Sequence, residues 1–248
     1  MLKGIDASHH NGAVDWKKVK AAGVEFAMLR AGFGWDNDSQ IDRQLQNNIQ
    51  GCEAAGLPYG LYHYSYAQNP ADAKREAAFF LRVIRDAKPL YPVAFDFEEK
   101  AQLALPPETQ LAIIEAFLGE IKAAGYYGIL YMSASSLENL NRYARERIGR
   151  FDCWVAHIDT DKPAFSGDYG IWQYSWKGKI DGIQGNVDLD YAYRDYPALI
   201  KEAGLNGWEA KKPVPETVPK AQYDALAAKV AELAEEMEAL IKKLKLTI

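Results

Sequence analysis

Residues 21–31 have the sequence AAGVEFAMLRA, which contains the end of one structural element and the start of the next. Two alanines close a helical pattern, Gly23 stands where helices end in a left-handed turn, and a strand-like apolar run follows. The same Ala-Ala-Gly arrangement recurs at 54–56 and at 123–125. Asn69-Pro70 opens another unit, with an N-cap residue before a proline at the first helical position. This repetition predicts alternating strands and helices, which is typical of a parallel sheet.

The first five strands are predicted at 2–6, 25–31, 57–66, 91–97 and 128–132. After residue 150 the segments FDCWVAHI, YGIWQYSW and NVDLDYAY follow one another too closely for crossover helices. They predict three closing strands, some of them antiparallel, with a last helix near 195–203. The predicted fold class of residues 1–205 is α/β, a shortened β/α barrel of five parallel βα units plus three closing strands. A full eightfold barrel typically needs about 250 residues.

Two further segments follow the predicted barrel. Residues 206–220 hold three prolines and show no apolar periodicity, which predicts a linker. Residues 221–248 carry a heptad seam, with alanines beside it at 227 and 234; its members are Tyr223, Leu226, Val230, Leu233, Met237, Leu240 and Leu244. A helix this short is marginal alone, so we expect a C-terminal coiled coil that joins copies into a homo-oligomer. Folding back onto the barrel, or docking onto another protein or a wall component, are the alternatives.

The composition argues against several classes of protein. The 248 residues include 29 Lys or Arg and 34 Asp or Glu, a net charge of −5 that disfavours a nucleic-acid partner. No apolar run approaches the ~18 residues of a membrane span, and residues 1–20 lack the apolar core of a signal peptide. We therefore expect no membrane insertion, synthesis in the host cytoplasm and another route to any extracellular target. Cys52 and Cys153 lie within apolar patterns and are expected to be unpaired.

The segment Pro92–Glu99, PVAFDFEE, is an apolar strand that ends in carboxylates. Side chains alternate along a strand, so Asp96 and Glu98 should share one face, about 6–7 Å apart. In a barrel the carboxyl ends of the strands form the active-site mouth. Two such carboxylates suit acid/base hydrolysis of a glycosidic bond, although the separation lies between the retaining and inverting ranges. A turn or a helix cap is the structural alternative for this acid pair.

Two other acids stand at strand ends. Asp6 ends the first strand and Asp188 lies in the last, and a closed barrel makes these strands neighbours. Both side chains can then converge on Asp96 and Glu98. By itself Asp6 would equally well cap a turn, and Asp188 alternates with apolar neighbours, as Asp190 does, like any half-buried strand residue.

Aromatic residues are concentrated on the same strands: Tyr62, Tyr64, Tyr66, Tyr131, Trp154, Trp172, Tyr174 and Trp176. Their flat faces suit stacking on sugar rings, although core packing would account for roughly half of them. Gln173 lies between Trp172 and Tyr174 and points to the opposite face from both. Only one of these two sets can face the mouth.

Further recognisable segments are MLKGIDASHHNGAVDWKKVKAAGVEFAMLRAGFG, YGLYHYSYA, LYMSAS, WVAHI and IWQYSWKGKIDGIQGNVDLDY. Together with PVAFDFEE, they resemble glycoside hydrolase family 25 over residues 1–200. These are the Chalaropsis-type lysozymes, or N-acetylmuramidases, found in many phage endolysins. The resemblance implies a β/α barrel of five parallel and three further strands that cleaves the β-1,4 bond after N-acetylmuramic acid in bacterial peptidoglycan. It implies no cofactor and no metal. A phage or prophage origin is expected from it, together with the missing signal peptide.

The resemblance also assigns residues. By the family's D-x-E motif, Glu98 would be the general acid and Asp96 its partner carboxylate, while Asp6 and Asp188 match outer acids that position the cluster. The positions that match the lining of the glycan groove are Tyr62, Tyr64, Tyr131, Trp154 and Gln173. Many phage members carry wall-binding repeats after the catalytic domain, whereas this chain shows only the linker and the heptad segment, which favours avidity through oligomers.

Three other functions are compatible with the sequence. A metal-dependent cell-wall amidase or deacetylase would use the same acids as ligands, although His9, His10, His63 and His157 lack the regular spacing of a zinc site. A non-catalytic glycan-binding barrel would keep the groove and lose the acid. A scaffold whose main function is the heptad tail would not need the acids at all.

Overall fold

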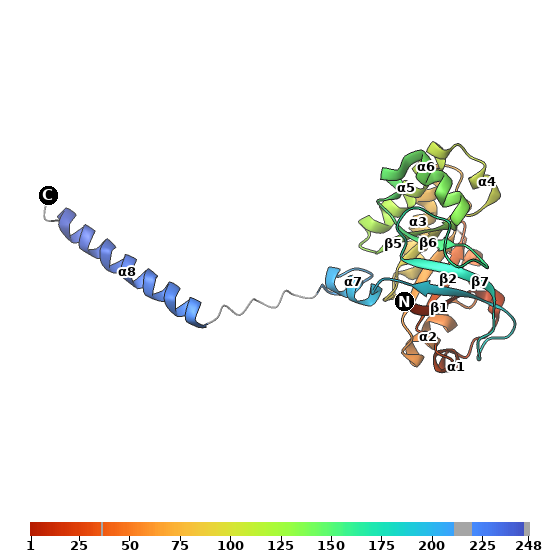
Figure 1. Ribbon diagram of the computed structural model, residues 1–248, viewed down its shortest axis with the longest axis horizontal. Helices are drawn as coiled ribbons and strands as arrows, with labels where there is room; N and C mark the ends of the chain where they lie inside the picture. Colours follow the sequence, from red (N-terminus) through yellow and green to blue (C-terminus); the bar gives the residue numbers. More distant parts are fainter. Residues whose placement is uncertain (36, 211–219, 246–248) are drawn as a thin grey trace. The chain divides into compact units, whose positions relative to one another are not determined.

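The computed structural model describes residues 1–35, 37–210 and 220–245. The chain divides into two compact units, Met1–Lys211 and Lys212–Ile248. The first unit contains all the strands and seven of the α-helices found in the described residues (Figure 1). The second contains helix α8, Lys220–Lys245. Among the described residues, none of the helices is both long and apolar enough to cross a membrane.

Eight strands close into a barrel in sequence order, which confirms the predicted fold class. They are β1 (Leu2–Ala7), β2 (Phe26–Phe33), β3 (Tyr59–Tyr64), β4 (Val93–Asp96), β5 (Gly128–Ser133), β6 (Asp152–Ala156), β7 (Ile171–Gly178) and β8 (Val187–Ala192). Strands β1 to β7 pair in parallel, and β8 pairs antiparallel with both β7 and β1. Of the three predicted closing strands, therefore, only the last reverses direction.

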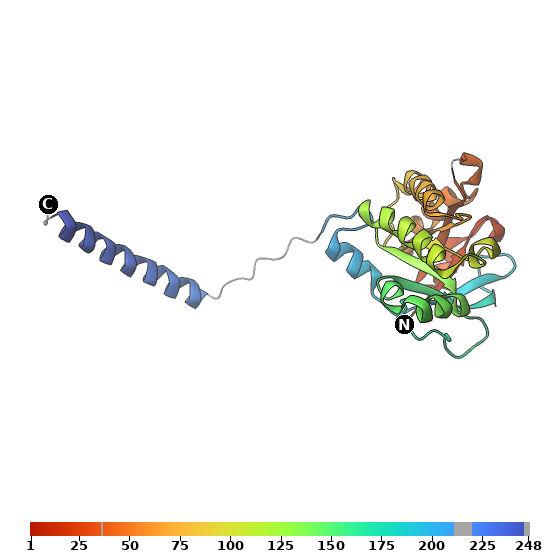
Figure 2. The same ribbon diagram turned by 90° about the horizontal axis from the view of Figure 1, so that it is seen from above.

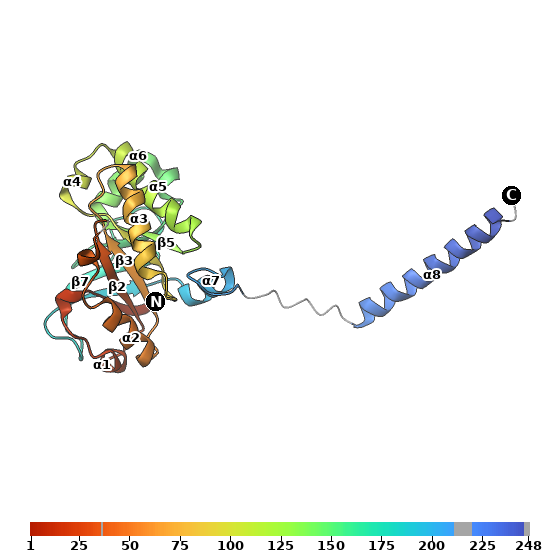
Figure 3. The same cartoon turned by 180° about the vertical axis from the view of Figure 1, so that it is seen from behind.

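Helices cover the outside of the barrel. They are α1 (Trp16–Ala21), α2 (Leu45–Ala55), α3 (Pro70–Ile84), α4 (Lys100–Leu103), α5 (Pro107–Ala123), α6 (Ala134–Ile148) and α7 (Tyr196–Ala203), with 3-10 turns η1 (His9–Asn11) and η2 (Asp38–Gln40). Helix α3 packs against α5, and the two lie side by side in Figure 2. Helices α1 and α2 pack together on a different side of the barrel (Figures 1 and 3).

The predicted helix ends are present at the three Ala-Ala-Gly sites. Gly23, Gly56 and Gly125 have φ angles of 90°, 62° and 80°, a region that side chains with a Cβ rarely adopt. Asn69 caps α3 by accepting a hydrogen bond from the Asp72 backbone N–H. These local signals therefore end and start the helices that separate the parallel strands.

Large apolar side chains fill one end of the barrel interior, where the parallel strands begin. Phe26 and Tyr91 stack with ring centroids 4.4 Å apart, and Tyr196 of α7 contacts Tyr91 from below at 5.4 Å. Gly4 is required beside them, because a Cβ there would lie 2.2 Å from the Phe26 ring. With this end closed by apolar packing, polar side chains can gather only toward the carboxyl ends of the strands.

The barrel unit continues beyond the predicted boundary at residue 205. Asn206 is fully buried, and its side chain accepts a hydrogen bond from Tyr127 N (2.9 Å) and donates to Pro89 O and Tyr91 O (3.1 and 3.0 Å). Trp208 packs on the same cluster. The predicted linker start at residue 206 is therefore too early, and most of that linker, residues 211–219, lies outside the described residues.

Candidate active site

Five acidic side chains gather at the carboxyl-end half of the barrel. Asp6 of β1 lies directly opposite Asp188 of β8 in the antiparallel register, and Asp190 is two residues deeper along β8. Asp96 ends β4, and Glu98 follows it at the mouth. Asp6, Asp96 and Asp190 are buried, with exposed fractions of 8%, 5% and 0%, whereas Glu98 is exposed. The structure thus brings together all four acids predicted for the site and adds a fifth.

Gln173 connects two of these acids. Its side-chain amide donates to Asp6 Oδ2 at 2.7 Å and to Asp188 Oδ2 at 3.4 Å, while its Oε1 accepts a hydrogen bond from the Tyr131 hydroxyl at 2.9 Å. Gln173 therefore faces the interior, and Trp172 and Tyr174 do not. Trp172 points outward, with its Nε1 donating to His157 O at 2.9 Å, and Tyr174 stacks on Tyr191 outside the barrel.

Asp190 is the fifth acid of the cluster, and in the sequence it resembles an ordinary half-buried strand residue. It is fully buried, and it accepts a hydrogen bond at 2.8 Å from Trp154 Nε1. Asp190 Oδ2 has no hydrogen-bond partner among the described residues. The alternation of side chains along the strand does indicate this role, because Asp190 stands two residues from Asp188 and so shares its face.

The crowding of carboxyl groups raises their pKa values. Burial first, and then the neighbouring Glu98 and Asp6 charges, raise the pKa of Asp96 well above its usual range, with Arg30 opposing the shift. Burial and the Asp188 charge do the same for Asp6, and burial with the Asp6 charge does so for Asp190. Burial raises the pKa of Asp188 to about 6. The cluster therefore retains protons at pH values where free carboxyls are ionised.

Glu98 combines exposure with a raised pKa. Desolvation by the surrounding residues is the largest cause of this raised pKa, and the charges of Glu99 and Asp188 raise it further. Glu99 itself is held by the Tyr64 hydroxyl, which donates to its Oε1 at 2.9 Å. A carboxyl that stays protonated while open to solvent is suited to donate a proton to a bound substrate.

The predicted aromatic residues occupy two different environments. Tyr62, Tyr131 and Trp154 are buried and pack edge to face beneath the acids, with centroid distances of 5.8 Å for Tyr62 to Trp154 and 4.6 Å for Tyr131 to Trp154. They form the floor of the site. Tyr64 is partly exposed and lines the wall beside Glu99.

A hollow extends from Tyr64 along the β2–β3 side of the mouth. A cavity of about 370 Å³ is lined by His9, His10, Arg30, Phe33, Tyr64 and Tyr66. Tyr66 also lines a neighbouring cavity of about 580 Å³, with Gly34, Trp35, Asn37, Ser39 and Gln40. The exposed aromatic rings and polar groups of this hollow are the kind of lining that binds sugars. Arg30 and Phe33 carry no signal of this role in the sequence, because only the folded barrel places them beside Tyr64.

His9, His63 and His157 lie in structural contacts. His9 hydrogen-bonds Asp42, which also accepts from Arg30 Nε at 2.9 Å, and His63 is buried among aromatic rings of α3 and α5. His157 Nδ1 accepts from Ala164 N at 2.9 Å. In the described part of the chain, no group of three His, Cys, Asp or Glu side chains is arranged to hold a metal ion.

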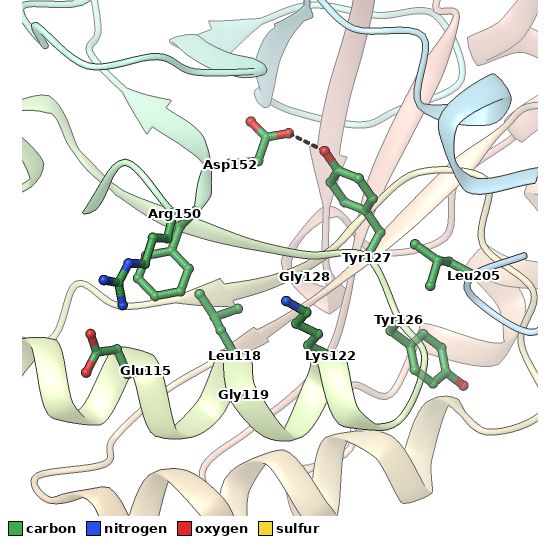
Figure 4. A pocket seen from close by; sticks show the side chains of 11 residues that line it. Glu115, Leu118, Gly119, Lys122, Tyr126, Tyr127, Gly128, Arg150, Asp152 and Leu205 are labelled. Atoms are coloured by element: carbon green, nitrogen blue, oxygen red, sulfur yellow. Dashed lines mark hydrogen bonds between the residues drawn. The ribbon is translucent and has the colours of Figure 1, made fainter. Parts of the chain in front are cut away.

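Another cavity, of about 570 Å³, lies away from the acids. Its lining includes Lys122, Tyr127, Gly128 and Asp152. Figure 4 shows the hydrogen bond that the Tyr127 hydroxyl donates to the Asp152 carboxylate. Gly128 and Asp152 are the first residues of β5 and β6, so this cavity opens at the end of the barrel opposite Asp96. It contributes nothing to the carboxylate cluster.

Comparison with known proteins agrees with this site. The family model described as glycosyl hydrolases family 25 matches residues 5–183. The chain is 28% identical to the autolytic lysozyme of Clostridium acetobutylicum over 190 residues, covering 76% of this chain and 55% of the relative.

Two solved structures share the fold. The modular autolysin LytC of Streptococcus pneumoniae has a TM-score of 0.65 and 31% identity, covering 76% of this chain and 46% of that one. It has also been solved in complex with a synthetic peptidoglycan ligand. The CTP1L endolysin has a TM-score of 0.66 and 25% identity, covering 81% and 70% of the two chains. The family match spans most of the barrel and includes Asp6, Asp96 and Glu98, so this chain belongs to glycosyl hydrolase family 25 and is a glycoside hydrolase.

Proposed function

We propose that the protein is a lysozyme that hydrolyses the β-1,4 bond between N-acetylmuramic acid and N-acetylglucosamine in bacterial peptidoglycan. The observation that carries this proposal is the pairing of a buried Asp96 with an exposed Glu98 of raised pKa at the mouth of the barrel. The names of the relatives support the substrate: an autolytic lysozyme, and an autolysin solved with a peptidoglycan ligand.

In this proposal Glu98 is the general acid. Its carboxyl proton passes to the glycosidic oxygen as the bond from that oxygen to C1 of the muramic acid breaks. Asp96 acts on the sugar side, where it stabilises positive charge near C1 or orients the substrate's N-acetyl group as an internal nucleophile. Water then completes the hydrolysis at C1.

The remaining acids act through position and charge. Gln173 holds Asp6 and Asp188 together, and Asp188 contributes to the raised pKa of Glu98. We assign Asp6 and Asp188 as positioning residues, and the charge of Asp188 helps to keep Glu98 protonated at the pH of the reaction. Tyr62, Tyr131 and Trp154 support this arrangement from below, and Tyr64 lines the glycan groove with Gln173 at its base.

The test is the release of reducing sugar ends from purified Gram-positive peptidoglycan, with fragments identified by mass. The intact protein should release fragments that end in muramic acid, and Glu98→Gln should reduce the rate by at least about 100-fold. Glu120→Gln, at a partly exposed position on α5, is the matched control and should keep full activity. Release of peptide without new sugar ends would instead indicate an amidase, and binding without cleavage would indicate a glycan-binding barrel.

We also propose a phage or prophage origin with synthesis in the host cytoplasm, which the likeness to the CTP1L endolysin supports. For the second unit we propose self-association of α8, the predicted homo-oligomer. The support is its heptad pattern together with the exposure of its seam, where Tyr223 is 66% and Leu226 is 64% exposed. Light scattering on the full chain and on a chain without residues 212–248 tests this, and equal monomeric masses would refute it.

A further inference from the structure

Helix α8 presents a long apolar stripe to solvent. Seven large side chains on it are between 46% and 66% exposed: Tyr223, Leu226, Val230, Leu233, Met237, Leu240 and Ile241. Contiguous exposed apolar surface of this kind usually marks an interaction site. The two flanks of this stripe differ in chemistry, and that difference indicates how the helix pairs.

One flank is charged and the other is apolar. With Tyr223, Val230 and Met237 at heptad position a, position g holds Gln222, Lys229 and Glu236. Position e, on the other flank, holds Ala227, Ala234 and Ile241. All six of these flanking residues belong to the described part of α8.

A parallel pair cannot use the charges on this helix. In a parallel coiled coil, position g of one helix faces position e of the other. Lys229 would then face Ala234 of the second copy, and Glu236 would face Ile241. Neither charge would have a partner of opposite charge on the second helix at these positions, and each would lie against an apolar side chain of that helix.

Reversing one helix brings like flanks together. Position g then faces position g, and Lys229 of each copy meets Glu236 of the other, which makes two ion pairs of opposite charge. On the opposite flank Ala227 meets Ala234, and these small side chains allow the helices to approach closely. In the seam, Val230 meets Leu233 and Leu226 meets Met237, so each layer joins an a to a d side chain.

We infer that α8 pairs with α8 of a second copy of this chain in antiparallel orientation. This inference rests on the proposed self-association and specifies its partner surface and direction. In such a pair the two chains enter at opposite ends, so the two copies of residue 220 are about 35 Å apart at 1.5 Å per residue. The two catalytic units are then attached to separate ends of the pair, which suits binding at two points on a wall polymer.

Charge reversal tests the orientation. Lys229→Glu alone and Glu236→Lys alone each replace two attractive contacts by two repulsive ones, and each should weaken self-association about tenfold in sedimentation equilibrium. The chain with both substitutions, and an equal mixture of the two single variants, should recover it. Glu235→Lys and Lys242→Glu are the matched controls, because these f positions lie away from the seam, and both should leave association unchanged.

A distance measurement separates this inference from the proposal on which it rests. Cys52 and Cys153 are 0% and 1% exposed, so Lys242→Cys offers a single accessible thiol for a spin label. An antiparallel pair places the two labels about 32 Å apart along the axis, whereas a parallel pair leaves them level, separated only across the two helices. A dimer with the short distance, or with no response to charge reversal, overturns the antiparallel inference and leaves self-association standing. A monomer at all concentrations overturns both.

Discussion

Asp6 and Asp188 lie directly opposite each other across the antiparallel pair of β1 and β8, and the Gln173 amide donates a hydrogen bond to both carboxyls. Two acids in this position repel each other when both are ionised, and burial adds to the cost. Gln173 offsets part of that cost, since its hydrogen bond lowers the pKa of Asp6 while burial and Asp188 raise it. The antiparallel closure of the barrel therefore adds the Asp188 charge to the environment of Glu98, beside burial and the charge of Glu99.

Gln173→Leu should lower both stability and activity. The substitution leaves the buried Asp6 carboxyl and the Tyr131 hydroxyl without their hydrogen-bond partner, which costs about 1–3 kcal/mol of unfolding free energy. Urea unfolding and initial rates on peptidoglycan measure the two effects. Gln110→Leu is the matched control, because Gln110 is also buried and donates to backbone carbonyls far from the acids. It should lower stability without changing kcat, and an equal loss of kcat in both variants would contradict the role given to Gln173.

Asp188→Asn should flatten the pH dependence of stability. Burial raises the folded-state pKa of Asp188 from 3.8 to about 6, so the folded protein binds this proton more tightly than the unfolded chain. The stabilisation is complete below pH 3.8 and is lost as the pH rises through about 6. With solvent screening allowed for, the contribution is roughly 1–2 kcal/mol. Unfolding free energies from pH 4 to 7 should fall less in the variant, and identical slopes would argue against this assignment.

Asp96→Asn should increase stability while removing activity. Asp96 is 5% exposed, and its Oδ1 has no hydrogen-bond partner among the described residues. Replacing it by a neutral amide removes the cost of ionising a buried carboxyl near Glu98 and Asp6, with an expected gain of about 1 kcal/mol at neutral pH. The rate of glycan cleavage should fall at least about 100-fold. Calorimetry and reducing-end assays measure the two effects, and a variant that is both less stable and fully active would contradict the proposed site.

The pH profile of cleavage should follow the proton on Glu98. Because the proposed mechanism requires this carboxyl protonated, and its pKa is raised, activity should persist above the pH at which an ordinary glutamate ionises and then fall as the pH rises further. Asp188→Asn removes one of the charges that raise this pKa. The alkaline limb of kcat/KM should therefore move to lower pH in that variant. An alkaline limb that stays in place, or moves to higher pH, would show that an ionisation other than that of Glu98 controls the rate.

The end of the barrel unit can be tested by truncation. A chain that stops at residue 205 loses the buried Asn206 side chain and its three hydrogen bonds, together with Trp208. It should unfold at a clearly lower temperature than a chain that stops at residue 210, by several degrees or more. Asn206→Ala in the longer chain should reproduce most of this loss. Equal melting temperatures for the two truncated chains would place the boundary at residue 205 after all.

Local signals in the sequence were sufficient to predict the order of elements. The Ala-Ala-Gly helix ends, the cap at Asn69 and the apolar runs depend on interactions between residues close in the chain, so they are visible without the fold. The same holds for Asp96 and Glu98, because alternation along one strand places them on one face. The motifs that carry the family resemblance lie on these strand ends.

Contacts between distant segments could be decided only by the tertiary structure. Closure of the barrel through β8 sets Asp6 against Asp188, buries Asp190 under Trp154, and selects Gln173 over Trp172 as the residue facing the interior. Asn206 belongs to the barrel because its side chain satisfies backbone groups more than 75 residues away. Burial and charge are properties of such long-range packing, so the raised pKa values of the acids follow from the folded barrel and not from the pattern of residues along the chain.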